Sequence, residues 1–233
     1  MTHSFPGGVT DPRGERCFIE TAPGEVTAVE LKTGQVCWRM TGLGRPIAAT
    51  ASRLLTVVRD ADSFLMRIID ARSGVQTAAV PLPMIPAQET SRELEGLQIE
   101  AVEVGPRLRV SWHLRPHYSG GARPSAAAAS APETSGAFFL DIDSGTVQLD
   151  DAAPARTEPE VADVIDLGPH AEPADDVLGI KRMGDSLYSL KMEQRGPNDM
   201  HLKLEAKDAL SGSVQWETGL SQIDAAPPEP QRE

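Results

Sequence analysis

Hydrophobic and polar residues alternate along most of the chain in runs of five to eight residues, and clusters rich in Gly, Asp, Ser and Pro separate the runs. Alternation with a period of two is typical of β-strands that bury one face, and such clusters are typical of turns. The pattern therefore predicts an all-β chain of about fifteen short strands. The runs span residues 16–20, 26–31 and 35–40; 45–51, 53–60, 63–70 and 75–81; 97–104, 107–114, 136–142 and 146–150; and 176–183, 186–193, 200–206 and 213–219.

A short motif recurs four times between pairs of these runs: an acidic residue, two variable residues, Ser or Thr, and Gly. The acidic and hydroxyl side chains can accept hydrogen bonds from the backbone N–H groups of a turn, and Gly supplies the positive φ that closes a short hairpin loop. The motif therefore predicts four structural hairpin turns of one kind, two of them followed by a Trp. The copies are Glu30, Thr33 and Gly34 with Trp38; Asp70, Ser73 and Gly74; Asp141, Ser144 and Gly145; and Asp208, Ser211 and Gly212 with Trp216.

This motif resembles the repeat of the quinoprotein (PQQ)-like β-propeller family, whose blades carry the pattern Ala-x-Asp-x-x-Thr-Gly-x-x-x-Trp. The match is closest over residues 28–38 and 206–216, and the resemblance as a whole covers residues 15–114, 137–149 and 177–220. It implies four-stranded antiparallel blades around a central axis. The predicted fold is thus an all-β propeller of four quinoprotein-like blades.

The spacing of the repeats predicts one propeller unit interrupted by loop insertions and flanked by flexible ends. The first blade is expected to lack its innermost strand, because the residues before Arg13 are rich in Gly and Pro. Four blades are about half of a common ring, so two arrangements stay open. Either a second copy or another protein completes an eight-bladed ring, or four blades close a small one. The ranges are 13–220 for the propeller, 81–96, 118–136 and 150–176 for the insertions, and 1–12 and 221–233 for the ends.

Composition restricts the partners and the compartment. The net charge is −12, which repels phosphate backbones, so no nucleic acid partner is expected. No apolar run approaches 18 residues, and no apolar segment resembling a secretory signal stands near residue 1. We therefore expect no membrane insertion and a cytoplasmic location. The two cysteines, Cys17 and Cys37, are too few for a disulfide framework, and both are expected to be buried thiols.

The insertion at 150–176 carries nine acidic residues, four prolines and one basic residue, which is the composition of a disordered loop. A small apolar island lies inside it. One interpretation is a docking motif that folds on a protein partner, and the other is a strand or cap that attaches the loop to the propeller. The island consists of Val161, Val164, Ile165 and Leu167.

The residues give no catalytic, cofactor-binding or metal-binding assignment, and no cofactor is expected. Asp141–Gly145 is similar to the start of a calcium loop, but the twelfth position is Ala152 instead of Glu. His113 and His117 share a strand face without a third ligand nearby. The family resemblance allows a quinone-dependent dehydrogenase, but the adjacent cysteines that such enzymes use are missing here. The predicted function is a non-catalytic protein-binding or scaffolding module of a bacterial complex. A dehydrogenase-like protein and a carbohydrate- or small-ligand-binding propeller are the alternatives.

Overall fold

A computed structural model gives the fold of the chain. It describes residues 3–60, 63–81, 97–105, 107–114, 134–142, 144–150, 177–196 and 199–224. These residues form seventeen β-strands and no helix, so the predicted all-β class is confirmed. Accordingly, the described part of the chain offers no long apolar helix that could cross a membrane.

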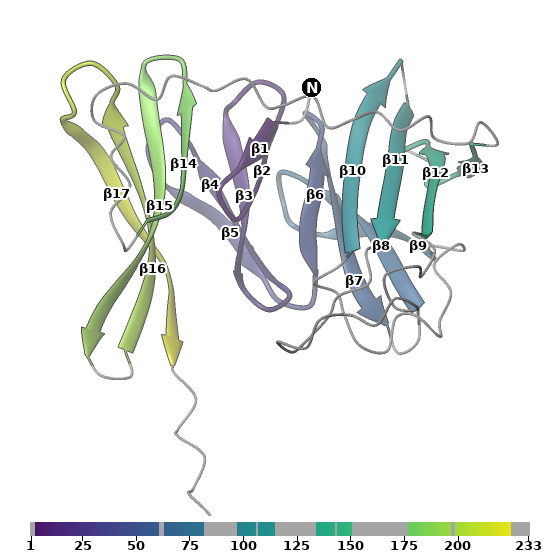
Figure 1. Cartoon of the computed structure of the whole chain (residues 1–233), viewed down its shortest axis with the longest axis horizontal. Helices are drawn as coiled ribbons and strands as arrows, with labels where there is room; N and C mark the ends of the chain where they lie inside the picture. Colours follow the sequence, from purple (N-terminus) through teal and green to yellow (C-terminus); the bar gives the residue numbers. More distant parts are fainter. Residues whose placement is uncertain are drawn as a thin grey trace, which may run out of the picture.

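The strands form four antiparallel sheets in which each strand pairs with its neighbour in the sequence (Figure 1). This meander is the blade topology of β-propellers. The first sheet contains β1 (His3–Phe5), β2 (Gly8–Thr10), β3 (Arg16–Ala22), β4 (Glu25–Glu30) and β5 (Val36–Met40). The second contains β6 (Arg45–Ala49), β7 (Arg53–Asp60), β8 (Ser63–Asp70) and β9 (Gln76–Pro81). The third contains β10 (Leu97–Val104), β11 (Arg107–Leu114), β12 (Thr134–Leu140) and β13 (Val147–Leu149). The fourth contains β14 (Val177–Met183), β15 (Ser186–Gly196), β16 (Asp199–Asp208) and β17 (Val214–Asp224).

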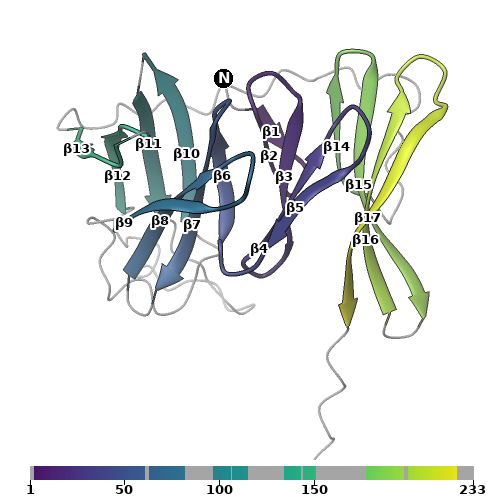
Figure 2. The ribbon, with the colours of Figure 1, turned by 180° about the vertical axis from the view of Figure 1, so that it is seen from behind.

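The four sheets stand side by side in a row, and the views from opposite sides agree on their order: fourth, first, second, third (Figures 1 and 2). The last sheet in the sequence therefore packs against the first, while the third and fourth sheets lie at opposite ends of the row. Three apolar cores fill the spaces between neighbouring sheets, and we call them the fourth–first, first–second and second–third joints. No core among the described residues joins the third sheet to the fourth.

Each joint is built from the alternate residues that the strands turn toward one another, as the period-two pattern requires. The joints are therefore ordinary close-packed interiors, and their residues serve folding. The fourth–first joint includes Cys17, Ile19, Val29, Tyr188 and Leu204; the first–second joint includes Phe18, Ala28, Trp38, Leu54 and Ile69; and the second–third joint includes Leu55, Met66, Ile68, Trp112 and Phe138.

The expectation that the first blade lacks an innermost strand is wrong. Residues 3–10, assigned above to a flexible end, form β1 and β2, and β2 pairs with β3. Gly8 is required in this strand because the two backbones approach closely: a Cβ there would lie 1.9 Å from the backbone oxygen of Phe18. Val9 and Thr10 of the same strand are buried. The glycine thus belongs to a packed strand.

The predicted insertions lie almost wholly outside the described residues. β12 begins at Thr134, within the range 118–136, and Asp150 is the described part of 150–176. At the other end of the chain, β17 extends to Asp224, so part of the predicted flexible tail belongs to the fourth sheet. Val161, Val164, Ile165 and Leu167 also lie outside the described residues.

Candidate functional site: the hairpin turns and the inner groove

The four motif copies occupy the turn between the last two strands of each sheet. In every copy the N–H of the acidic residue donates to a carbonyl five residues later, and the glycine N–H donates back to the carbonyl of the acidic residue. All four glycines have positive φ, between 70° and 75°. The second set of bonds joins Gly34 to Glu30 (2.8 Å), Gly74 to Asp70 (2.9 Å), Gly145 to Asp141 (2.8 Å) and Gly212 to Asp208 (2.9 Å).

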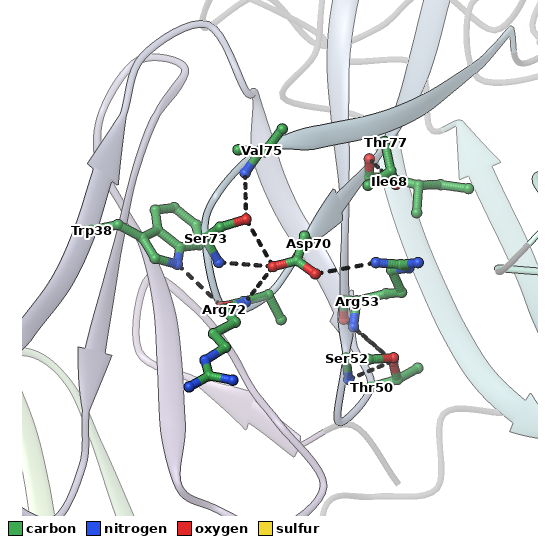
Figure 3. A network of polar contacts seen from close by, with 11 residues as sticks. Trp38, Thr50, Ser52, Arg53, Ile68, Asp70, Arg72, Ser73, Val75 and Thr77 are labelled. Carbon is green, nitrogen blue, oxygen red and sulfur yellow. Dashed lines mark hydrogen bonds and ion pairs between the residues drawn. The ribbon is translucent and has the colours of Figure 1, made fainter.

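Asp70 shows how the acidic side chain holds the turn (Figure 3). One carboxylate oxygen accepts hydrogen bonds from the backbone N–H groups of Arg72 and Ser73 and from the Ser73 hydroxyl, at 3.1, 2.8 and 2.8 Å. The other oxygen faces Arg53 at 3.2 Å. The Ser73 hydroxyl and backbone bonds, aided by Arg72 and by the charge of Arg53, lower the pKa of Asp70 below its ordinary value of 3.8. Asp208 is held in the same way, chiefly by the backbone and hydroxyl of Ser211, and its pKa is also lowered.

These lowered pKa values predict how stability depends on pH. A carboxyl group with a lower pKa in the folded state contributes stability that is present above its unfolded pKa and is lost as the pH falls through the folded pKa. Replacing Asp70 and Asp208 together by Asn keeps an acceptor and removes the charge. We expect this variant to melt below the wild type near neutral pH, and the difference in melting temperature to narrow as the pH falls below 3.8 and through the lowered pKa values of the two aspartates. If the difference in melting temperature did not narrow in acid, the ionised carboxylates of Asp70 and Asp208 would not be what stabilises the turns.

Two tryptophans connect neighbouring sheets, because each packs on the hairpin turn of the next sheet and hydrogen-bonds to it. Trp38 of β5 lies against the turn of the second sheet, where its indole N–H donates to the backbone oxygen of Ala71 at 3.1 Å. Trp216 of β17 does the same on the first sheet and donates to the backbone oxygen of Leu31 at 3.1 Å. A turn glycine is needed beneath each ring: a Cβ on Gly74 would lie 2.9 Å from Trp38.

The third sheet departs from this arrangement. In the other three sheets a β-bulge between the last two strands follows the turn. Because of this bulge, the residue two positions before the acidic one pairs with the residue four positions after the glycine: Ala28 with Trp38, Ile68 with Ala78 and Ala206 with Trp216. The pairing of β12 with β13 has no such bulge, so Gln148 takes that place and Leu149 is one residue out of register. A slip of one residue turns a side chain to the other face. The third sheet therefore presents no apolar side chain equivalent to Trp38 at the end of the row.

The strand pairing, the repeated turn and the docking of one sheet on the next fix the architecture. The chain is built from β-propeller blades. No known protein-family model matches it, and no curated protein matches it. Three solved structures with the same kind of fold are similar at low identity, all with TM-scores below 0.5.

BamB from Moraxella catarrhalis has 13% identity and a TM-score of 0.35, over 88% of this chain and 46% of that one. The Pan2 WD40 domain of Neurospora crassa has 11% identity and a TM-score of 0.29, over 89% and 47%. The β-propeller domain of the Trilobed protease from Pyrococcus furiosus has 11% identity and a TM-score of 0.28, over 98% and 84%. The chain thus spans about half the length of the first two proteins.

Strands β2, β6 and β10, one from each of the first three sheets, line a groove of about 900 Å³ together with parts of β3 and β7, and we call it the inner groove. Strand β6 lies beside both β2 and β10, so the groove crosses two joints of the row. Its apolar lining includes Val9, Ile47, Val58, Ile99 and Val102. The described lining contains no aromatic side chain, whereas the carbohydrate-binding alternative predicted an aromatic pocket.

Charged side chains of both signs flank this apolar lining. Arg45, Arg59 and Glu100 are exposed, and Glu20 is half-buried and accepts a hydrogen bond from the Gly24 N–H at 3.0 Å. The Gly24 carbonyl in turn accepts from Leu43 at 2.9 Å, which ties the first sheet to the loop before β6. The groove is therefore a firmly supported, mixed apolar and charged surface.

Sequence reasoning missed the groove, because its residues come from three sheets and form no motif. The motif residues singled out by sequence form the hairpin turns, and none of them lines the groove. Of the two cysteines, Cys17 is buried as expected, and burial raises the pKa of its thiol, but Cys37 is exposed. Among the described residues no three His, Cys, Asp or Glu side chains gather as a metal site would require.

Proposed function

We propose that the chain is a non-catalytic protein-binding module of quinoprotein-like propeller repeats, and that the inner groove is the surface that receives its partner. The observation that carries the proposal is the groove itself: exposed or half-exposed aliphatic side chains of Val58, Ile99 and Val102, flanked by Arg45 and Glu100. Apolar contact area with charges at its rim is the usual composition of a surface that binds another protein.

The groove is supported by three sheets that are packed firmly against one another. Strands β2, β6 and β10 belong to three different sheets, and the joints between these sheets are closed by buried cores. A surface carried on such a frame loses little conformational freedom when it binds, which favours affinity. The three aspartates of the turns already accept hydrogen bonds from their own backbone, so they serve structure.

A substitution in the groove tests this proposal. Val102 is 51% exposed and lines the groove, so Val102→Asp should fold normally and weaken partner binding at least tenfold by placing a charge in the apolar contact. The matched control is Leu178→Asp, because Leu178 is 56% exposed on β14 and lies outside the groove lining.

The measurement is affinity capture from the cells that naturally produce the protein, followed by titration of each captured partner with the three proteins. We expect the wild type and the control to retain a partner that the groove variant loses. Equal capture by all three proteins, or no partner for the wild type, would show that the groove is not a protein-binding surface.

A further inference from the structure

The two outward faces of the row differ from the faces inside it at equivalent positions of the repeat. The residue just before the acidic residue of each turn points toward the preceding sheet in the row. In the first, second and third sheets it is Val29, Ile69 and Leu140, and each is fully buried in a joint. In the fourth sheet, which no other described sheet precedes in the row, the same position is Lys207.

Ion pairs cover the outward face of the fourth sheet. Glu205, which is 6% exposed, lies between Lys191 at 2.9 Å and Lys207 at 3.0 Å. Burial acts to raise the pKa of Glu205, but the hydrogen bonds and charges of the two lysines outweigh it and lower the pKa. On the same face Lys203 pairs with Glu217 at 2.5 Å. This face is therefore charged and already satisfied internally.

Polar bonds likewise cover the outward face of the third sheet. In every sheet one residue of the neighbouring strand pairs with the residue two positions before the acidic one. This residue is Phe18, Leu55 or Tyr188 in the other sheets, and it is Arg109 in the third sheet. Its guanidinium faces Asp150 at 2.8 Å. Beside it, Arg107 donates to Gln148 at 2.7 Å and covers the ring of Phe139 at 4.9 Å from its centroid.

We propose that these two faces are terminal caps: ion pairs replace the apolar joint residues at both ends of the row, so that a second copy does not dock there. Terminal repeats of stacked proteins need such polar outer faces to stay soluble. Contact between the third sheet of one copy and the fourth sheet of another would be head-to-tail, and repetition of that contact would give a ring or a filament. It would also bury paired charges, whose desolvation opposes association.

The test compares the oligomeric state of the wild type with that of a variant whose caps are made apolar. The variant takes the residues found at equivalent positions inside the row: Ser189→Ile, Glu205→Thr and Lys207→Val in the fourth sheet, and Arg109→Leu in the third. A control carries Arg13→Leu and Glu15→Thr, which remove an exposed ion pair in the turn between β2 and β3. Light scattering across a wide dilution series measures the mass, and circular dichroism checks folding.

We expect the wild type and the control to keep the monomer mass of 24.9 kDa throughout and the apolar-cap variant to form larger species. A wild-type dimer that Arg109→Glu converts to monomer would overturn the proposal. This result could be obtained even if the apolar-cap variant failed to fold. A folded apolar-cap variant that stays monomeric would overturn it as well. Neither result bears on the inner groove, so the proposed function stands or falls separately.

Discussion

Trp38→Ala is expected to lower the free energy of unfolding by about 4 kcal/mol, which is the range for truncating a buried Trp. Trp38 is 8% exposed and belongs to the first–second joint, with its ring centroid 5.8 Å from that of Phe18. The substitution removes this packing and leaves the backbone oxygen of Ala71 without the indole N–H. Urea unfolding followed by circular dichroism measures the loss, with unchanged m showing that only stability has changed.

Trp38→Phe separates the packing from the hydrogen bond. It keeps an aromatic ring in the joint and removes the N–H donor, so a smaller loss of about 1 kcal/mol is expected. Because the groove crosses the same joint, Trp38→Ala should also weaken partner binding at temperatures where the chain remains folded. A loss below about 1 kcal/mol for Trp38→Ala would mean that the joint does not depend on this residue.

The strands and turns were predictable because their causes are local. The run at 53–60 is β7, the run at 63–70 is β8, and the turn after Asp70 forms where its acidic residue, serine and glycine stand. Period-two alternation and turn chemistry act over a few residues, so one sequence suffices to detect them. Gly8 shows the limit of that approach, because its role depends on Phe18 of another strand.

The order of the sheets was not predictable, because it depends on contacts between distant residues. The hydrogen bond from Trp216 to Leu31 joins residues 185 positions apart, and no local sequence pattern at either residue indicates that they are in contact. The groove depends on the same order, since it exists only where β2, β6 and β10 come together. The motif makes Lys207 equivalent to Val29 in the sequence, but the end caps could be recognised only after the order of the sheets placed Val29 inside the row and Lys207 on an outward face.

Gly34→Ala is expected to cost about 3 kcal/mol, because it combines two penalties at one turn. The φ of Gly34 is +73°, which an Ala side chain adopts at a cost of about 1 kcal/mol. A Cβ would also lie 2.5 Å from the Trp216 ring and 2.8 Å from the Thr218 hydroxyl oxygen. Both side chains would have to move, although Trp216 donates to Leu31 and Thr218 donates to the Gly34 carbonyl at 2.6 Å. The fourth–first joint would therefore loosen.

Gly145→Ala is the matched control, because it isolates the contribution of the Trp. Gly145 has the same φ of +73° in the same turn, but the nearest atoms to a Cβ there are 3.7 Å away, on Ala78 and Val80. Only the backbone penalty applies, so a loss of about 1 kcal/mol is expected. The difference between the two variants, about 2 kcal/mol in urea unfolding, is then the cost of displacing Trp216 from the turn. Equal losses would mean that the fourth blade is not held to the first by this contact.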